Sequence, residues 1–394
     1  MFSRDKPRWL NSLHAGWPGV LVIAGLIPIG MDVFITGGVP WWIKIGMIVV
    51  PAVIFFLMLI PLTFPVQERV ASGVSYREML AEFGVLTAVI VSFLLTLQLI
   101  QFFPDVNPYI FVGIGVAIVA FFGIYTRSLG NPLLFVLALI MMPLATTEIG
   151  TDSWIEEIMK GVAADKFHSG WVLVYTSAIM MVLRFFAGPI VHKLSPLGLL
   201  IVSAALAIAG LYTLSFTTGM MIFVAATLYG IGKTFFWPTM LGIAGEQTPK
   251  GGALTLNALG GIGMLAVGTL GTAYIGTLQA DKAIEAVSNN PEIASMAPGL
   301  VVDGDLAVTE ERDIYAIIKY DTISDEKLNS ILESMPEDER DDIAARIEAI
   351  REASTQGALA NMCIFPAIML AAFIGLWLYF QSRGGYEAQH IGEG

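Results

Sequence analysis

Cysteine, histidine and charge are all scarce in this sequence, and each shortage excludes a class of protein. The single cysteine, Cys363, lies in an apolar run, so the chain cannot build a framework of internal disulfides. The four histidines are scattered and, together with one cysteine, give no cluster with the spacing of metal ligands. Charged residues make up only 14% of the 394 residues, against about 25% in an average soluble domain. We therefore expect no bound metal, no other cofactor and no large soluble core.

The sequence also lacks the short motifs that mark the commonest catalytic sites. It contains no glycine-rich phosphate-binding loop, no Gly-x-Ser-x-Gly elbow and no His-Glu-x-x-His pair. No nucleophile stands in a visible pattern with a general base, which argues against an enzyme embedded in a membrane. We expect the chain not to be an enzyme and to have no nucleic-acid partner.

Long apolar runs dominate what remains. Hydrophobic residues make up 56% of the chain, and the mean hydropathy is +0.73. Ten runs are long enough to cross about 30 Å of hydrocarbon, at residues 17–37, 41–64, 83–103, 107–125, 132–155, 171–191, 197–216, 220–244, 253–278 and 358–380. Each must be helical, because a backbone in lipid satisfies its own hydrogen bonds, and a barrel would show shorter, alternating segments. The sequence predicts an all-α polytopic membrane protein with about ten transmembrane helices.

The charges of the short loops orient these helices. A basic N-terminal segment leads into a long apolar run without a small-residue cleavage site, so we expect a retained helix and not a removed signal peptide. Ten spans place both termini on one side, where the basic loop residues also gather. These are Arg4, Lys6, Arg8, Arg69, Arg77, Arg127, His192, Lys193, Lys250 and Arg383. Because cytoplasmic loops are rich in lysine and arginine, we expect a multi-pass protein of the cell (inner) membrane with both termini cytoplasmic.

The net charge of −12 belongs to one segment, residues 279–357, between the last two apolar runs. This insert holds 19 acidic and 7 basic residues, whereas the rest of the chain holds 14 of each. The same topology places the insert outside the cell. Helical spacing of isoleucines and the break at Pro336 predict two helices, at 324–335 and 337–354. The insert is either a small exterior helical subdomain or a solvated acidic loop with no specific role.

Two carboxylates, Glu148 and Asp152, lie one helical turn apart near the end of the fifth apolar run. An acid at bilayer depth is costly unless it faces a cavity or a partner, so its presence indicates a function. Glu148 lies about 16 residues, or roughly 24 Å, from the cytoplasmic start of its helix, in the outer half of the membrane. We interpret it as a proton carrier or as a hydrogen-bond acceptor for a polar solute. Asp152 lies nearly at the exterior surface, where we expect a solvated helix end.

Two basic residues, Arg184 and Lys233, also lie inside apolar runs. Each is about 14 residues, or roughly 21 Å, from the exterior end of its own helix, which places both in the inner third of the membrane. This depth count predicts that Glu148 is not their direct partner. We expect Arg184 to serve a cytoplasmic gate, while Lys233 either binds a solute in the cavity or extends toward the cytoplasmic interface.

The sequence at residues 229–239 is typical of an interrupted helix. Pro238 removes one backbone hydrogen bond, and Gly230 and Gly232 permit either close helix packing or local opening. Interrupted helices at mid-membrane often mark transporter sites. The indole of Trp237 either stacks on a sugar-like ring or packs against neighbouring helices.

Residues 184–195, Arg-Phe-Phe-Ala-Gly-Pro-Ile-Val-His-Lys-Leu-Ser, resemble a loop signature of the major facilitator superfamily. That signature, Arg-x-x-x-Gly-x-x-x-Asp-Arg-x-Gly, lies between the eighth and ninth helices of the family. Gly188 and Lys193 match it, and His192 stands where the family has aspartate. The resemblance implies a cytoplasmic gate formed by Arg184, Gly188, His192 and Lys193.

Two further segments carry the same resemblance. Residues 230–263, with a glycine-rich turn, an aromatic-Pro-Thr sequence and a Gly-Gly pair, are similar to the tenth and eleventh helices of the family's sugar-permease branch. Residues 147–154 resemble the substrate-lining part of its seventh helix, where an acid is common. The resemblance covers residues 132–383 and implies a complete six-helix C-terminal half.

Upstream, residues 9–19 resemble the entry to the family's fifth helix, and the run that ends at residues 64–69 resembles the end of its sixth. The family's first four helices have no counterpart, so we expect either a truncated chain or a partner subunit that supplies them. We therefore divide the chain into five parts. Residues 1–64 form two helices from the end of the N-terminal half, residues 65–82 form a cytoplasmic linker with an interfacial helix from Ser75 onward, and residues 83–131 form two extra transmembrane helices. Residues 132–383 form the C-terminal half, with the insert at 279–357, and residues 384–394 form a cytoplasmic tail.

The resemblance implies transport of a small polar solute, a sugar or a related compound, by alternating access. Either Glu148 couples this transport to protons, or it accepts a hydrogen bond from the solute. The candidate solute-binding residues are Glu148, Thr151, Lys233, Trp237 and Asn257. The expected partners are the lipid bilayer, the solute, protons and the subunit that completes the bundle. Two alternatives remain open. One is a non-transporting membrane sensor or assembly subunit that acts through the insert, and the other is a truncated, inactive permease.

Overall fold

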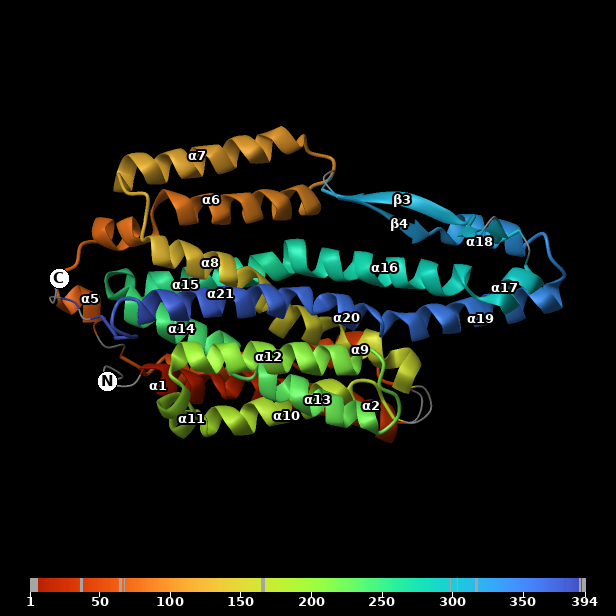
Figure 1. Ribbon diagram of the computed structural model, residues 1–394, viewed down its shortest axis with the longest axis horizontal. Helices are drawn as coiled ribbons and strands as arrows, with labels where there is room; N and C mark the ends of the chain where they lie inside the picture. The colour runs from red at the N-terminus through yellow and green to blue at the C-terminus, as the bar shows by residue number, and fades with distance from the viewer. Residues whose placement is uncertain are drawn as a thin grey trace.

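Long helices lie side by side along one axis in the computed structural model, which describes residues 6–35, 38–63, 66, 68–163, 167–297, 299–302, 304–315, 318–389 and 391 (Figure 1). The first helices are α1 (Lys6–His14), α2 (Gly16–Phe34), α3 (Trp41–Gly46), α4 (Val49–Leu59), α5 (Glu68–Ala71), α6 (Tyr76–Phe102) and α7 (Pro108–Thr126). The bundle continues with α8 (Pro132–Ala145), the π-turn η1 (Thr146–Gly150), α9 (Thr151–Ala163), α10 (Trp171–Phe185), α11 (Ala187–Leu194) and α12 (Pro196–Leu214). It ends with α13 (Met221–Lys233), α14 (Phe236–Gln247), the 3-10 turn η3 (Pro249–Gly251), α15 (Gly252–Ala266), the π-turn η4 (Val267–Gly271), α16 (Thr272–Ser288), α20 (Ala358–Met362) and α21 (Ile364–Gln381).

The described helices make this chain an all-α membrane protein. Eight helical segments are long and apolar enough to cross a membrane: Leu10–Asp32, Trp41–Leu59, Tyr76–Phe102, Pro108–Thr126, Pro132–Lys160, Pro196–Leu214, Pro249–Ser288 and Glu339–Gln381. Two other predicted runs give shorter helices. One is α10, and the other, at 220–244, is divided into α13 and α14. Length and composition therefore identify eight spans in the described chain, two fewer than the ten runs predicted.

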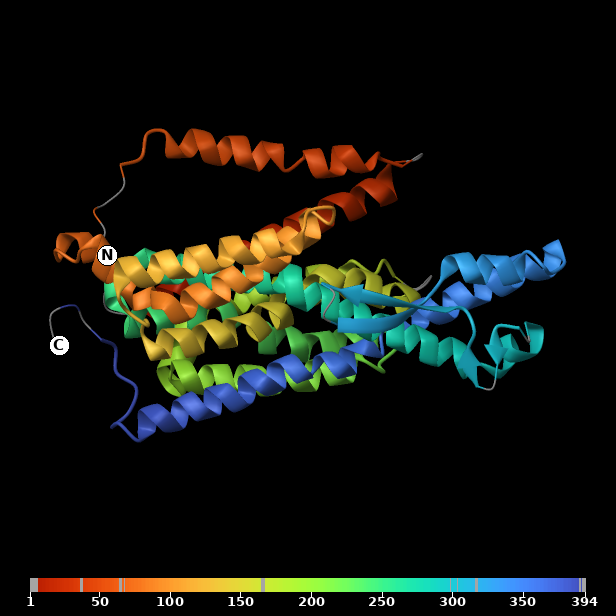
Figure 2. The ribbon, with the colours of Figure 1, turned by 90° about the horizontal axis from the view of Figure 1, so that it is seen from above.

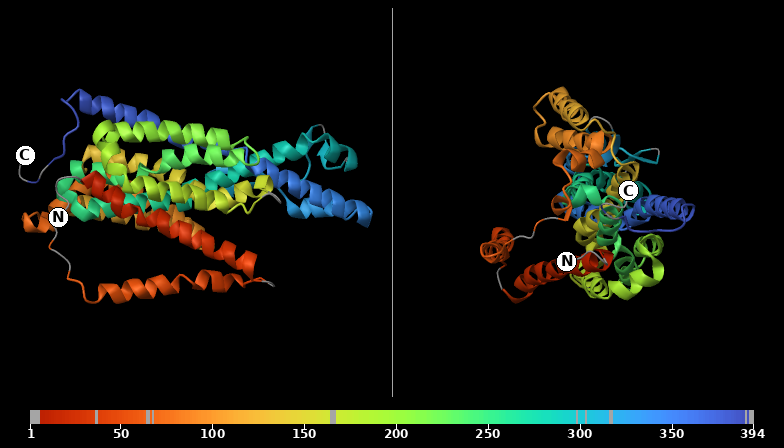
Figure 3. Two further views of the ribbon diagram at one scale, coloured as in Figure 1. Left: turned by 90° about the horizontal axis from the view of Figure 1, so that it is seen from below. Right: turned by 90° about the vertical axis from the view of Figure 1, so that its left-hand side faces the viewer.

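The main hydrophobic core lies among α8, α10, α12, α13, α14, α15 and α21. Large side chains within it are fully buried, among them Leu137, Met141, Tyr229, Phe236 and Phe373. By contrast, α3 and α4 have no buried residues and lie apart from the rest of the bundle (Figures 2 and 3). A helix that is apolar on every side without being buried in protein is suited to contact with lipid all round.

Glycine sets the approach of α12 and α13. A Cβ at Gly232 would lie 2.5 Å from the backbone nitrogen of Ala207, and one at Gly210 would lie 2.3 Å from that of Tyr229. Neither position has room for a side chain, so these two helices pack almost backbone to backbone. Of the two interpretations of Gly232, close packing is therefore confirmed.

A helix begins after Ser75 as predicted, but it continues into the next apolar segment as α6. Ser75 caps this helix in a capping box, in which its hydroxyl accepts from the Glu78 amide at 3.2 Å. The helix bends at Gly84, whose φ is 60° and whose Cβ would lie 2.1 Å from the backbone nitrogen of Gly130. Only glycine fits both this conformation and this contact.

The insert folds at the end of the bundle opposite the two termini (Figure 1). Its helices α17 (Pro291–Met296), α18 (Asp325–Leu332) and α19 (Glu337–Thr355) include the two predicted on either side of Pro336. It also contains two antiparallel hairpins that periodicity did not reveal, β1 (Val301–Val302) with β2 (Asp305–Leu306) and β3 (Thr309–Ile314) with β4 (Ile318–Ile323). Its own hydrophobic core includes Val287, Ile293, Leu300, Val308, Leu332, Ile343 and Ile347. The insert is a folded subdomain, and its interpretation as a solvated loop is wrong.

Candidate functional site

Four charged side chains meet inside the bundle. Glu148 lies on η1, Asp152 on α9, Arg184 on α10 and Lys233 on α13. The Arg184 Nη2 atom lies 2.7 Å from Glu148 Oε1, and Lys233 Nζ forms a second ion pair with Asp152 Oδ1. The side chain of Asp152 is 11% exposed, and those of the other three are at most 3% exposed. We call these four residues the charge cluster.

Pairing is what makes the burial of the charge cluster tolerable. Each ion taken out of water loses several kcal/mol of hydration, which only a close partner and further hydrogen bonds can offset. Two carboxylates and two cations leave the cluster without net charge. Each carboxylate also lies within electrostatic reach of both cations. A change of charge at any one member is therefore felt by the other three.

The other hydrogen-bond acceptors of Arg184 are two backbone carbonyl oxygens that prolines leave free. Its Nε donates to the Thr234 carbonyl oxygen at 2.7 Å, and its Nη1 donates to the His14 carbonyl oxygen at 3.0 Å. Four residues after each carbonyl stands a proline, Pro238 and Pro18 respectively. Proline has no N–H, so the carbonyl four residues earlier loses its helical donor. The sequence thus leaves two backbone acceptors free where two helices break, and the buried guanidinium uses both.

The second oxygen of Glu148 binds the start of a helix. Glu148 Oε2 accepts from the backbone N–H of Trp237 at 3.2 Å. Trp237 is the second residue of α14, and the first amides of a helix have no partner within it and carry a partial positive charge. The break between α13 and α14, which Pro238 predicted, therefore creates both an acceptor for Arg184 and a donor for Glu148.

Lys233 and Asp152 form the other half of the cluster. Lys233 is the last residue of α13, where a cation is favoured by the helix dipole, and its Nζ lies 4.8 Å from the ring centre of Tyr229. The Tyr229 hydroxyl is fully buried with its ring and donates to the Thr147 carbonyl oxygen of η1 at 2.6 Å. Tyr229 thus ties α13 to the π-turn that carries Glu148.

The depth count that separated Glu148 from Arg184 is wrong, since the two are direct partners. The expectation of a solvated Asp152 is also wrong, because this residue is paired with Lys233 and largely buried. Depth counting treats helices as uniform rods. Here α8 passes into a π-turn and the α13–α14 segment is broken, and long basic side chains add reach of their own. The gate role of Arg184 stays a prediction. The predicted separation of Arg184 from Glu148 does not hold.

The other predicted solute-binding residues are divided between the cluster and its surroundings. Thr151 is fully buried at the start of α9, next to Asp152. The indole of Trp237 packs against α15, where a Cβ at Gly263 would lie 3.1 Å from its Cη2 atom, and its role in solute binding stays a prediction. Asn257 is exposed on α15 and does not join the cluster.

The remaining predicted gate residues lie on α11. Gly188 is buried there, Lys193 is exposed, and the side chain of His192 lies outside the described part of the chain. Their gate role stays a prediction. Sequence reasoning also missed three contributors to the cluster, namely Tyr229 and the carbonyls of His14 and Thr234. The spacing of Pro18 and Pro238 was the signal that could have revealed the two carbonyls.

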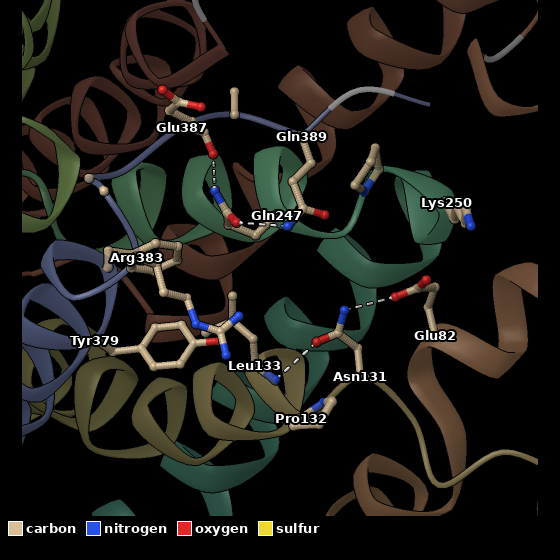
Figure 4. Close-up of a pocket in the computed structure, with 15 residues that line it drawn as sticks. Glu82, Asn131, Pro132, Leu133, Gln247, Lys250, Tyr379, Arg383, Glu387 and Gln389 are labelled. Atoms are coloured by element: carbon tan, nitrogen blue, oxygen red, sulfur yellow. Dashed lines mark hydrogen bonds between the residues drawn. The ribbon is translucent and has the colours of Figure 1, made fainter. Parts of the chain in front are cut away.

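A polar cavity of about 700 Å³, whose lining residues are drawn in Figure 4, lies at the end of the bundle that carries the termini. None of these lining residues belongs to the charge cluster. Helices α6, α8, α14 and α21, the turn η3 and the C-terminal tail line the cavity. The Gln247 Nε2 atom donates to the Glu387 carbonyl oxygen at 2.7 Å, and Asn131 Nδ2 donates to Glu82 Oε2 at 3.1 Å. The tail thus covers one side of this cavity by binding the end of α14.

No protein-family model, curated protein or solved structure matches this chain.

Proposed function

We propose that this chain is a secondary transporter that moves a small polar solute, a sugar or a related compound, across a cell membrane by alternating access. The observation that carries the proposal is the charge cluster, which is buried among apolar helices, several of which are candidate membrane spans. Ionisable residues inside membrane helices are rare and mark ion or substrate pathways. Broken helices whose free backbone groups face such residues recur at transporter sites.

The resemblance to the major facilitator superfamily supports the same proposal. Arg184 begins the segment that resembles the family's loop signature, and Glu148 lies in the segment that resembles its substrate-lining helix. The two family-like segments therefore supply the two partners of the 2.7 Å ion pair. On this basis we assign residues 132–383 to a C-terminal half and the upstream helices to part of an N-terminal half.

In the proposed cycle, the Glu148–Arg184 pair opens and closes as the site changes its access. A proton on the Glu148 carboxylate removes the charge that holds Arg184, which then keeps only the carbonyls of His14 and Thr234. These carbonyls lie at the α1–α2 and α13–α14 breaks, so a shift of Arg184 acts on two hinge points at once. A polar group of the solute then takes the place of Glu148 beside the guanidinium.

Uptake into proteoliposomes tests this proposal. The chain is reconstituted, and uptake of radiolabelled hexoses and polyols is measured with and without an inward proton gradient. We expect gradient-dependent uptake of at least one compound, and we expect Glu148→Gln to abolish its dependence on the gradient. Glu156→Gln, which neutralises an exposed carboxylate on α9, is the matched control and should behave like the unmodified chain. Gradient-dependent uptake that survives unchanged in Glu148→Gln would remove Glu148 from the mechanism.

The insert favours a second candidate, a non-transporting membrane sensor or assembly subunit. An acidic segment with its own hydrophobic core has the structure needed to bind a partner protein. In this case the partner binds residues 279–357 and no solute crosses the membrane. Replacement of the insert by a short linker separates the two candidates, because a transporter retains measurable solute flux, whereas a sensor loses its partner and its signal.

We also propose that the end of the bundle with both termini faces the cytoplasm and that the insert faces the exterior. The basic loop residues Arg127, Lys250 and Arg383 support this orientation. Protease added to intact cells should then cleave the insert and leave a C-terminal epitope tag intact. Cleavage of the tag alone would reverse the orientation.

A further inference from the structure

The tip of the β3–β4 hairpin holds its first residue in a rare conformation. The two strands pair up to Ile314 and Ile318, and Tyr315 follows directly after β3. Its φ of 58° lies in the left-handed region, which residues other than glycine adopt rarely. Such a residue persists only where its surroundings hold it in place.

Tyr315 reaches out of the insert and onto the bundle. Its hydroxyl donates to the Thr269 carbonyl oxygen of η4 at 3.0 Å and lies 3.4 Å from Gln101 Oε1 on α6. A gap of only about 20 Å³ remains between the hairpin tip and the α15–α16 segment. Burial raises the pKa of Tyr315, so its hydroxyl keeps its proton and acts as a donor at neutral pH.

The π-turn that Tyr315 binds packs directly on the π-turn that carries Glu148. Gly271 of η4 has no room for a side chain, since a Cβ there would lie 2.6 Å from Thr146 Oγ1. Thr146 is the first residue of η1, two positions before Glu148. π-turns are uncommon and concentrate at functional sites. A continuous path of contacts therefore leads from the hairpin tip through η4 and η1 to the charge cluster.

We propose that Tyr315 is a positioning residue, through which the insert holds η4 against η1 and so sets the geometry of the Glu148–Arg184 pair. While the tip is docked, the two π-turns stay in contact and the ion pair stays closed. Release of the tip frees η4 to move and loosens η1. This link is mechanical, and it holds whichever solute crosses the membrane and also if none does.

Hydrogen–deuterium exchange of the full chain in lipid nanodiscs tests the link. Tyr315→Phe keeps the ring and removes only the hydroxyl. We expect the amides of η4, and also those of η1, to exchange about fivefold faster, the factor typical of one lost hydrogen bond. Tyr320→Phe removes a hydroxyl from β4 of the same hairpin and should leave both turns unchanged. A rise confined to η4 would make Tyr315 a local anchor and overturn the proposal.

A second variant cuts the path inside the bundle. Gly271→Ala places a methyl group against Thr146 and so parts η4 from η1, whereas Gly276→Ala, with nothing within 4 Å, is its control. In the Gly271→Ala background, Tyr315→Phe should still speed exchange in η4 but should add nothing in η1. An added effect in η1 would mean that the signal travels by another route, and the proposal would be wrong.

Discussion

Glu148→Gln should destabilise the folded chain, because it leaves the buried Arg184 guanidinium without its counter-charge. At 2.7 Å two unit charges attract by about 6 kcal/mol if the effective dielectric constant is about 20. Losses on breaking a buried pair are about 3–5 kcal/mol. Arg184 keeps its bonds to the carbonyls of His14 and Thr234, so we expect a loss near the lower end of that range, about 3 kcal/mol.

Thermal unfolding in a mild detergent measures this loss. The single cysteine, Cys363, is half-buried in the bundle, so its reaction with a thiol-specific dye reports unfolding. Glu148→Gln should lower the midpoint, and the double variant Glu148→Gln with Arg184→Met should recover most of the loss, because it removes both charges. Glu156→Gln should leave the midpoint unchanged, since that carboxylate is exposed.

Two results would contradict this expected loss of stability. The first is a midpoint for Glu148→Gln equal to that of the unmodified chain, which would mean that Arg184 does not depend on this carboxylate. The second is a double variant, Glu148→Gln with Arg184→Met, whose unfolding midpoint is lower than that of the less stable single variant. That result would mean that packing around the two side chains, and not their charge, holds η1 and α10 together.

Three further changes test other parts of the account. Lys233→Met should lower stability by about 3 kcal/mol, and adding Asp152→Asn should restore most of it, as measured by the same unfolding assay. Gly232→Ala should cost about 1–3 kcal/mol or prevent folding, because its Cβ would meet the α12 backbone at 2.5 Å. Tyr386→Phe removes the hydroxyl that donates to Glu246 Oε2 at 2.7 Å and should speed limited proteolysis of the tail. Burial raises the pKa of Tyr386 above its ordinary value of 10, so this contact persists below pH 10 and is lost only as the pH rises beyond it.

The membrane fold followed from the sequence because apolar runs of spanning length leave the backbone one solution, the helix. The break after α13 followed from Pro238, and the two insert helices followed from Pro336 and from the spacing of isoleucines. The β3–β4 hairpin did not, because β3 reads Thr-Glu-Glu-Arg-Asp-Ile and carries no alternation of apolar residues. Its position depends on packing along α16, which one segment of sequence does not encode.

The sequence placed the four residues of the charge cluster inside apolar runs but did not reveal their contacts. A charge inside an apolar run is costly wherever it occurs, which indicated a function for Glu148, whereas Asp152 was expected to be solvated. The pairing of the four residues depends on a π-turn, a helix break and the reach of the basic side chains. Local sequence specifies the helix break. The π-turns η1 and η4, by contrast, lie where helices pack through Gly271.

We propose that the Glu148–Arg184 pair is the working site of a proton-coupled transporter. Current recorded from proteoliposomes on a solid-supported membrane tests this proposal, because solute-driven proton entry carries charge. A hexose or polyol that is taken up should trigger a transient current in the unmodified chain and in Glu156→Gln, and none in Glu148→Gln. Equal currents in the unmodified chain and Glu148→Gln, or solute binding without any current in the unmodified chain, would contradict the proposal.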